Sequence, residues 1–295
     1  VSTIIHIAFA VYNPTVWALV LGNIVSALIS LIAGFFIYRK MTYRLTISRP
    51  YLSQIVNMGK WIFVSTLLFF FATSLDRLYL GRHISLELLG LYGVARSMSE
   101  VVVALVGRIN ALIVFPMVAA SGQSGAELRA RLARGRFAVL AATAVATSVF
   151  TASSDLIIKV LYDDRYLAAA VILPILSFSV WFSILGTLGE SILLGTGKPA
   201  PGAVANGTKL TWLLIGLPLA VPAYGLAGAI VVIASAELVR YVPIAVAMRR
   251  FGMGFTRQDA ALTLLMVALV LAWRGLAWLL GIAGPPLALF DLGRL

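Results

Sequence analysis

The stretch WIFVSTLLFFFATSL, from Trp61 to Leu75, contains fifteen residues and no charged side chain. A helix needs about 20 apolar residues to cross a hydrocarbon core of ~30 Å, and this stretch reaches that length with its flanks. A strand of a membrane barrel would instead alternate apolar and polar residues over about ten positions. The stretch therefore predicts a membrane-spanning helix over residues 60–80.

Seven other apolar runs repeat this pattern between loops that contain charges, glycine or proline. They lie at residues 16–38, 88–118, 137–157, 167–194, 206–222, 225–247 and 259–282. Segments such as Val101 to Val106 are continuously apolar rather than alternating, which favours helices over strands. We therefore expect an all-α polytopic membrane protein with about eight transmembrane helices.

The composition of the 295-residue chain agrees with this interpretation. Hydrophobic side chains make up 61% and charged ones 12%, with a mean hydropathy of +1.00, which excludes a water-soluble enzyme or binding module. The absence of cysteine excludes disulfides, thiolate catalysis and thiolate-bound metals. His6 and His83 lie far apart, so the sequence indicates no histidine metal site and no cofactor.

The basic residues predict how the helices are oriented. Fourteen of the 23 lysines and arginines fall in the loops after the first, third, fifth and seventh spans, where the only acids are Glu127 and Asp259. Short cytoplasmic loops retain positive charge, so these loops are predicted to be cytoplasmic, with Arg131 inside and Asp163 outside. The net charge of +12 then reflects membrane topology, and we expect no nucleic-acid partner.

One of these basic loops reads SGQSGAELRARLARGR, residues 121–136. Leu128 and Leu132 are about one helical turn apart, which predicts a short helix on the membrane surface with its arginines toward anionic lipid headgroups. The alternative is an ordinary polar connection that satisfies the positive-inside rule.

Ionisable residues inside the spans are the candidates for function, because each would cost at least ~2.5–3.5 kcal/mol if it faced lipid at mid-bilayer. On the helix expected at 88–118, Arg96, Glu100 and Arg108 fall within an arc of about 120°. We expect these three residues to face a cavity and bind substrate. In the alternative, Arg96 and Glu100 form a pair at the outer interface and only Arg108 lies deep.

Five more charged residues are secondary candidates. Asp76 and Arg77 would form an interfacial pair at the end of the span at 60–80 or line the mouth of a cavity. Glu237 and Arg240 are three residues apart and would form either a packing pair or a site. Glu190 lies near the inner end of its helix, where it would reach the headgroups or join such a site.

Arg274 lies near the outer end of the last span, between Trp273 and Trp278. These neighbours predict an anchor that reaches toward an aromatic belt at the membrane surface. Counting Arg274, the spans hold four arginines against three glutamates, and this balance leans toward an anionic substrate.

Residues 71–95, FATSLDRLYLGRHISLELLGLYGVA, resemble the start of the second lobe of Wzx-type polysaccharide flippases, which belong to the multidrug/oligosaccharidyl-lipid/polysaccharide exporter superfamily. The resembling elements are Asp76 at a helix end, the turn from Leu78 to Gly81, Ser85 and the run from Leu89 to Ala95. Weaker matches follow at 193–198 and 224–229, so the resemblance covers about residues 54–250.

That family has two lobes around a central cavity. The resemblance implies that residues 1–53 end a first lobe, with one partial helix, one full helix and a cytoplasmic linker. Residues 54–250 would be the second six-helix lobe, and residues 251–295 an additional transmembrane helix and tail. Because Val1 opens inside a hydrophobic segment, we expect an N-terminally truncated chain that lacks most of the first lobe.

The resemblance implies a flippase of the bacterial inner membrane. Such a protein moves an undecaprenyl-diphosphate-linked oligosaccharide by alternating access, for polysaccharide and lipopolysaccharide biosynthesis. Its partners would be this lipid-linked sugar and the surrounding membrane lipids, with the coupling ion, H⁺ or Na⁺, left open. Arginine within a span fits this function, because a dianionic diphosphate must be matched by cations that keep their charge.

Three rivals remain. A drug/cation antiporter of the same fold would favour acidic residues in its cavity. A membrane-embedded glycosyltransferase or ligase would need catalytic acids or histidines on a sizeable loop, whereas the longest outer connection has about ten residues, so we expect no enzyme. A structural scaffold without transport would leave Arg108 unexplained.

Overall fold

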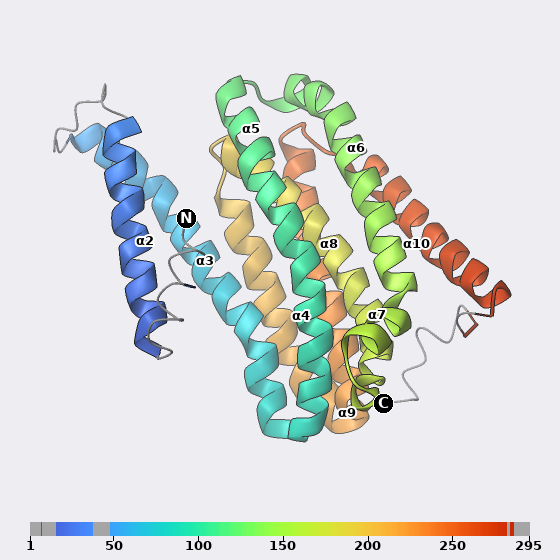
Figure 1. Cartoon of the computed structure of the whole chain (residues 1–295). Coiled ribbons are helices and arrows are strands. Elements are labelled where there is room, and N and C mark those ends of the chain that lie inside the picture. Colours follow the sequence, from blue (N-terminus) through green and yellow to red (C-terminus); the bar gives the residue numbers. More distant parts are fainter. Residues whose placement is uncertain (1–6, 8–15, 38–47, 282–283, 286–295) are drawn as a thin grey trace. The chain divides into compact units, whose positions relative to one another are not determined.

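The computed structural model describes residues 7, 16–37, 48–281 and 284–285, and within these ranges it contains helices and turns but no strand (Figure 1). Contacts divide the chain into two units, residues 1–52 and 53–295. In the first unit, α2 (Val16–Ile37) is a 22-residue apolar helix. Most of the predicted linker falls on residues 38–47, which lie outside the described ranges.

The second unit is a helix bundle. Its elements are α3 (Arg49–His83, which begins just before the unit), α4 (Leu86–Ile109), η1 (Asn110–Val114), α5 (Phe115–Ser121), α6 (Gly125–Ala152), α7 (Ser154–Leu161), η2 (Asp164–Tyr166), α8 (Ala169–Gly195), α9 (Ala200–Arg250) and α10 (Thr256–Leu279). Six helical stretches of the described residues are long and apolar enough to cross a membrane. The prediction of an all-α polytopic membrane protein is therefore confirmed.

The 51 residues of α9 form two antiparallel spans. A straight helix of this length would measure about 76 Å, far more than a membrane core. The chain reverses at Gly225, whose φ of 57° and ψ of −139° suit glycine because a Cβ would be strained there. The two arms are joined by hydrogen bonds: Trp212 Nε1 on the first arm donates to Val232 O at 3.2 Å and to Ser235 Oγ at 3.0 Å on the second arm. The spans predicted at 206–222 and 225–247 are the two arms of this hairpin.

The span predicted at 88–118 is continuous but contains one wide turn, the π-helix η1. Pro116 has no N–H to donate to the carbonyl one turn earlier, and the backbone accommodates this loss by widening the helix. The Phe115 N–H bonds to the Asn110 carbonyl, five residues back. Asn110 Nδ2 then donates to Ser191 Oγ at 2.6 Å, which fastens the wide turn to α8.

The surface helix predicted within residues 121–136 is not a separate element. Residues from Gly125 onward continue directly into the next span as the single helix α6, since no proline or internal glycine turn interrupts them. Leu128 and Leu132 are 1% and 4% exposed and pack in the protein core instead of against lipid. Arg136 is also buried, whereas Arg129 and its neighbouring arginines are exposed.

Three of the loops predicted to share one side of the membrane, those that join α5 to α6, α8 to α9 and α9 to α10, lie at one end of the bundle (Figure 1). The Lys198 ammonium lies 3.7 Å from the centre of the Phe251 ring, and Gly252 lies against Gly125. At the opposite end, Tyr162 packs against a core cluster that contains Leu226 and also Leu80 and Leu91, which flank the turn between α3 and α4. The basic loops are thus separated in space as well as in sequence from the acidic outer turn.

This segregation yields a topology prediction that can be measured in intact cells. Cysteine placed at Arg131 should resist an impermeant thiol reagent, and cysteine placed at Asp163 should react, because the two exposed positions would lie on opposite sides of the membrane. The native chain contains no cysteine and serves as the blank. Equal labelling of both positions would contradict the orientation.

Candidate functional site

A cavity of about 330 Å³ lies among α3, α4, α8 and α9. Its polar lining consists of Thr73, Arg96, Ser99, Glu100, Ser179, Ser183 and Glu237. Phe69 and four aliphatic residues form the rest of the wall. The cavity therefore offers one guanidinium, two carboxylates and several hydroxyls within an otherwise apolar bundle.

Charged residues of α3 and α4 form the first cluster beside this cavity. Arg96 Nε donates to Glu100 Oε1 at 2.9 Å, and Arg77 Nη2 donates to the same oxygen at 3.1 Å. Asp76, 2% exposed, accepts a hydrogen bond from the Tyr92 hydroxyl and lies 3.7 Å from Arg96 Nη1. Residues 92, 96 and 100 share a face because they are four apart on one helix.

Exposure differs sharply within this first cluster. The side chains of Arg77 and Glu100 are 55% and 49% exposed, whereas that of Arg96 is 16% exposed. Arg96 is therefore held between a buried carboxylate, Asp76, and an accessible one, Glu100. An incoming anion could replace Glu100 without disturbing Asp76.

Four charged residues of α8 and α9 form a second cluster, of which Glu237 lines the cavity. Arg240 donates to Glu190 Oε2 at 2.5 Å, to Glu237 Oε2 at 3.4 Å and to Asn206 Oδ1 at 2.8 Å. Lys209 Nζ donates to Glu237 Oε1 at 2.5 Å. Two cations and two carboxylates thus neutralise one another across the α9 hairpin and between α9 and α8.

A polar layer continues this cluster to α3. Asn206 Nδ2 donates to Ser65 Oγ at 2.9 Å and to its carbonyl at 3.1 Å, and Ser65 Oγ donates to Glu190 Oε1 at 3.3 Å. Gly202 allows this close approach, since a Cβ there would lie 2.4 Å from Glu190 Oε1. Ser65, Asn206 and Glu190 together close the bundle at this level.

The structure brings most of the predicted site residues together. Arg96 and Glu100 join Asp76 and Arg77 in one cluster, and Glu190, Glu237 and Arg240 form the other, with Glu237 lining the same cavity as Arg96. Arg108 lies apart from them. It is exposed near the end of α4, and it has no ion pair with any residue that the structure describes. Its substrate role stays a prediction.

Two basic residues do not lie where the sequence placed them. Lys209 is one of the fourteen basic residues counted in the predicted cytoplasmic loops, but it is 4% exposed within α9. Arg274 is not an anchor at the membrane surface, because it is 4% exposed and donates to Asp155 Oδ1 at 2.5 Å and to the Ala152 carbonyl at 3.2 Å. The sequence feature that could have predicted this pairing is the reversal at Gly225, because an antiparallel hairpin there brings Lys209 on the first arm near Glu237 on the second arm.

These ion pairs change the interpretation of the four arginines and three glutamates counted inside the spans. Arg136 Nη1, also assigned to a loop, donates to Asp259 Oδ1 at 2.5 Å, and Tyr241 donates to the other oxygen of the same carboxylate. Each buried cation has an acidic partner on another helix or helix arm, and the two clusters beside the cavity hold four cations and four acids. A surplus of arginine therefore does not indicate an anionic substrate.

Comparison with known proteins matched the chain to a family. The model of a family described as "Polysaccharide biosynthesis protein" matches residues 1–171. No curated protein and no solved structure matches the chain. The match includes α3, Arg96, Glu100 and Arg108, whereas α8, α9 and the second charged cluster lie beyond it or continue past its end.

The neutrality of the second cluster yields a prediction about stability. Lys209→Met should clearly lower the thermal unfolding temperature in detergent. Removing one partner of a buried ion pair leaves the other charge uncompensated, which costs ~3–5 kcal/mol of stability. Adding Glu237→Gln should recover most of this loss, since Arg240 keeps Glu190 and the cluster is neutral again. Lys159→Met, which alters an exposed lysine of α7, is the control. A double variant less stable than either single variant would contradict the pairing.

Proposed function

The chain belongs to the polysaccharide biosynthesis protein family, because the family match covers more than half of the chain. On this premise we propose that the protein is a flippase. Its substrate is an undecaprenyl-diphosphate-linked oligosaccharide, which it moves across the bacterial inner membrane by alternating access. The family and the apolar helices point to a transporter-type, multi-pass membrane protein rather than to an enzyme. The substrate and the membrane are inferences from the resemblance and the charged cavity.

The observation that carries this proposal is Arg96, a guanidinium that lines a cavity inside an apolar bundle. Arginine binds a phosphate through two parallel N–H groups and keeps its charge when partly desolvated. Glu100 is the accessible partner of Arg96, so the diphosphate replaces Glu100 there. The diphosphate then also accepts the hydrogen bond that Arg77 donates to Glu100. Arg108, exposed further along α4, contacts the same substrate.

This exchange also supplies a role for the coupling ion. Glu100 loses its two guanidinium partners when the diphosphate binds, and a carboxylate without a cation is unfavourable inside a membrane. A proton or Na⁺ binds to Glu100 at that moment and leaves when the substrate departs. Asp76, whose hydrogen bond from Tyr92 is buried, stays in place and keeps Arg96 oriented.

Alternating access requires helices that bend. Pro174 lies within α8, Pro218 and Pro243 lie within the two arms of α9, and η1 interrupts the span that begins with α4. Each removes or displaces a backbone hydrogen bond, and neighbouring helices tolerate such defects within a membrane bundle. These positions allow the cavity to open toward either side.

A drug/cation antiporter is the second candidate, because the cavity is lined by two carboxylates, Glu100 and Glu237, and by a single arginine. A cationic substrate would bind between the carboxylates and would need Arg96 only as a structural partner. The two functions therefore differ in which residue is essential.

The flippase proposal predicts how variants behave in a strain that lacks its own flippase and receives the intact gene. Arg96→Ala should lose most surface polysaccharide, while Arg96→Lys should keep part of it, because lysine supplies the charge without the forked donor. Arg108→Ala should also reduce export. Arg165→Ala, which removes an exposed arginine of the outer turn, is the control at matched expression.

Two outcomes would overturn the proposal. Arg96→Ala and Arg108→Ala variants that export polysaccharide at the level of the Arg165→Ala control would remove the cationic site. Resistance to cationic drugs that depends on Glu100, without any change in surface polysaccharide, would support the antiporter instead.

A further inference from the structure

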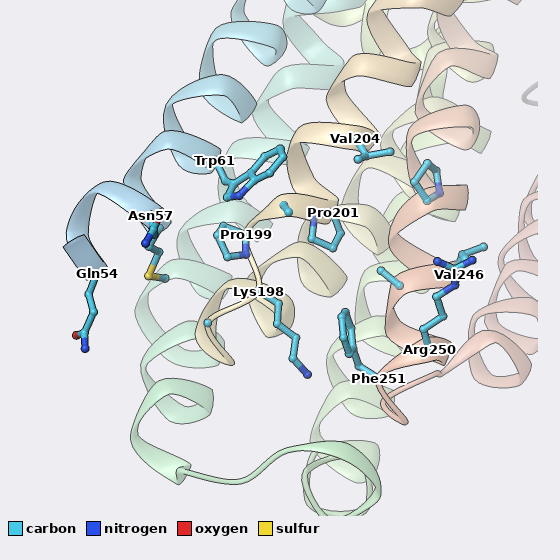
Figure 2. A pocket seen from close by; sticks show the side chains of 15 residues that line it. Gln54, Asn57, Trp61, Lys198, Pro199, Pro201, Val204, Val246, Arg250 and Phe251 are labelled. Carbon is cyan, nitrogen blue, oxygen red and sulfur yellow. The ribbon is translucent and has the colours of Figure 1, made fainter. Parts of the chain in front are cut away.

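A second cavity, of about 780 Å³, lies at the basic end of the bundle and is separate from the central one (Figure 2). The first turns of α3 form one wall, the start of α9 forms the floor, and the end of α9 forms the other wall. Its lining includes the polar residues Gln54, Asn57, Lys198 and Arg250 and the aromatic ring of Phe251. We call this cavity the basic groove.

Two cations without acidic partners face the basic groove. Figure 2 shows Lys198 and Arg250 on either side of the Phe251 ring, with Lys198 Nζ 3.7 Å from the ring centre. No carboxylate lines the groove, and neither cation forms an ion pair within the described part of the chain. Because no carboxylate lines the groove, these two positive charges are available to an external anion.

The remaining lining of the groove is apolar. Trp61 and Met58 on α3 face Val204 and Val246 on the two arms of α9, with Pro199, Pro201 and Pro243 between them. A soluble anion gains nothing from such walls, whereas a lipid fills them with hydrocarbon. The groove thus combines a dication with a surface suited to an acyl or polyprenyl chain, which matches a lipid that carries two phosphate charges.

The basic groove and the central cavity lie along the same face of α3. Trp61 lines the groove, Phe69 lines the central cavity, and the two residues are about 12 Å apart along the helix. Between them lies the layer in which Ser65 bonds to Asn206 and Glu190. Parting of this layer would connect the two cavities.

We propose that the basic groove is a loading site that binds the diphosphate of a polyprenyl lipid before the lipid enters the central cavity. The identification of this lipid as the transported substrate rests on the proposed flippase function. Lys198 and Arg250 neutralise the two phosphates, and Asn57 and Gln54 donate hydrogen bonds from the facing wall. The first isoprene units lie against Trp61, and the Ser65 layer keeps the groove closed from the central cavity until the lipid is seated.

The probe for this proposal is farnesyl diphosphate, titrated against the purified full chain in nanodiscs of uncharged phosphatidylcholine. Lys198→Gln and Arg250→Gln should each weaken binding about fivefold, and the double variant further, because each cation near a lipid phosphate contributes roughly that factor. Arg257→Gln is the matched control, since it removes an arginine from another, more polar cavity at the same end. Farnesol, which lacks phosphate, should bind much more weakly.

The result that overturns the proposal is an unchanged affinity for farnesyl diphosphate in the double variant. Equal competition by phosphatidylglycerol would also overturn it, because the groove would then hold any anionic phospholipid. Failure of the flippase proposal is recognised separately. If only the flippase proposal fails, the Arg96→Ala variant exports polysaccharide normally and the native protein still binds farnesyl diphosphate in the groove. If only the loading-site proposal fails, export still depends on Arg96, and the double variant binds farnesyl diphosphate as tightly as the native protein.

Discussion

A charged side chain inside a hydrocarbon layer has to be matched, and this constraint organises the whole second unit. Besides the pairs of Arg77 and Arg96 that join α3 to α4, four ion pairs join its elements: Arg136 with Asp259, Arg274 with Asp155, Arg240 with Glu190 and Lys209 with Glu237. They connect α6 to α10, α10 to α7, α9 to α8, and the two arms of α9. Apolar packing alone would leave the helices free to slide and rotate, because lipid is as apolar as a leucine side chain. The pairs fix which faces meet.

The same constraint shapes the central cavity. The cation of each of those four pairs is at most 6% exposed, whereas Arg77 and Glu100 are both about half exposed, so the Glu100 carboxylate is accessible to an anion that competes for Arg96. The neutral second cluster provides a wall that neither attracts nor repels a charged lipid strongly. Under the proposed function, selectivity for a diphosphate would come from the exchange at Arg96 and from the cations of the basic groove, rather than from an overall surplus of arginine.

The sequence predicted the helices well because a membrane span is set by local composition. The apolar runs, the reversal near Tyr224 and the gathering of basic loops at one end could all be derived from the chain alone. The ion pairs could not, because pairing depends on which helices become neighbours. Lys209 and Asp259 were therefore assigned to loops, and Arg274 was read from its tryptophan neighbours rather than from Asp155, more than a hundred residues earlier.

The central claim is that Arg96 carries a lipid diphosphate across the membrane, and reconstitution tests it most directly. The protein is placed in liposomes with a fluorescent oligosaccharide linked to a polyprenyl diphosphate, and a membrane-impermeant reductant quenches whatever reaches the outer leaflet. We expect quenching beyond the outer-leaflet fraction for the native protein and not for Arg96→Gln. Equal quenching by both proteins, or no gain over protein-free liposomes, would contradict it.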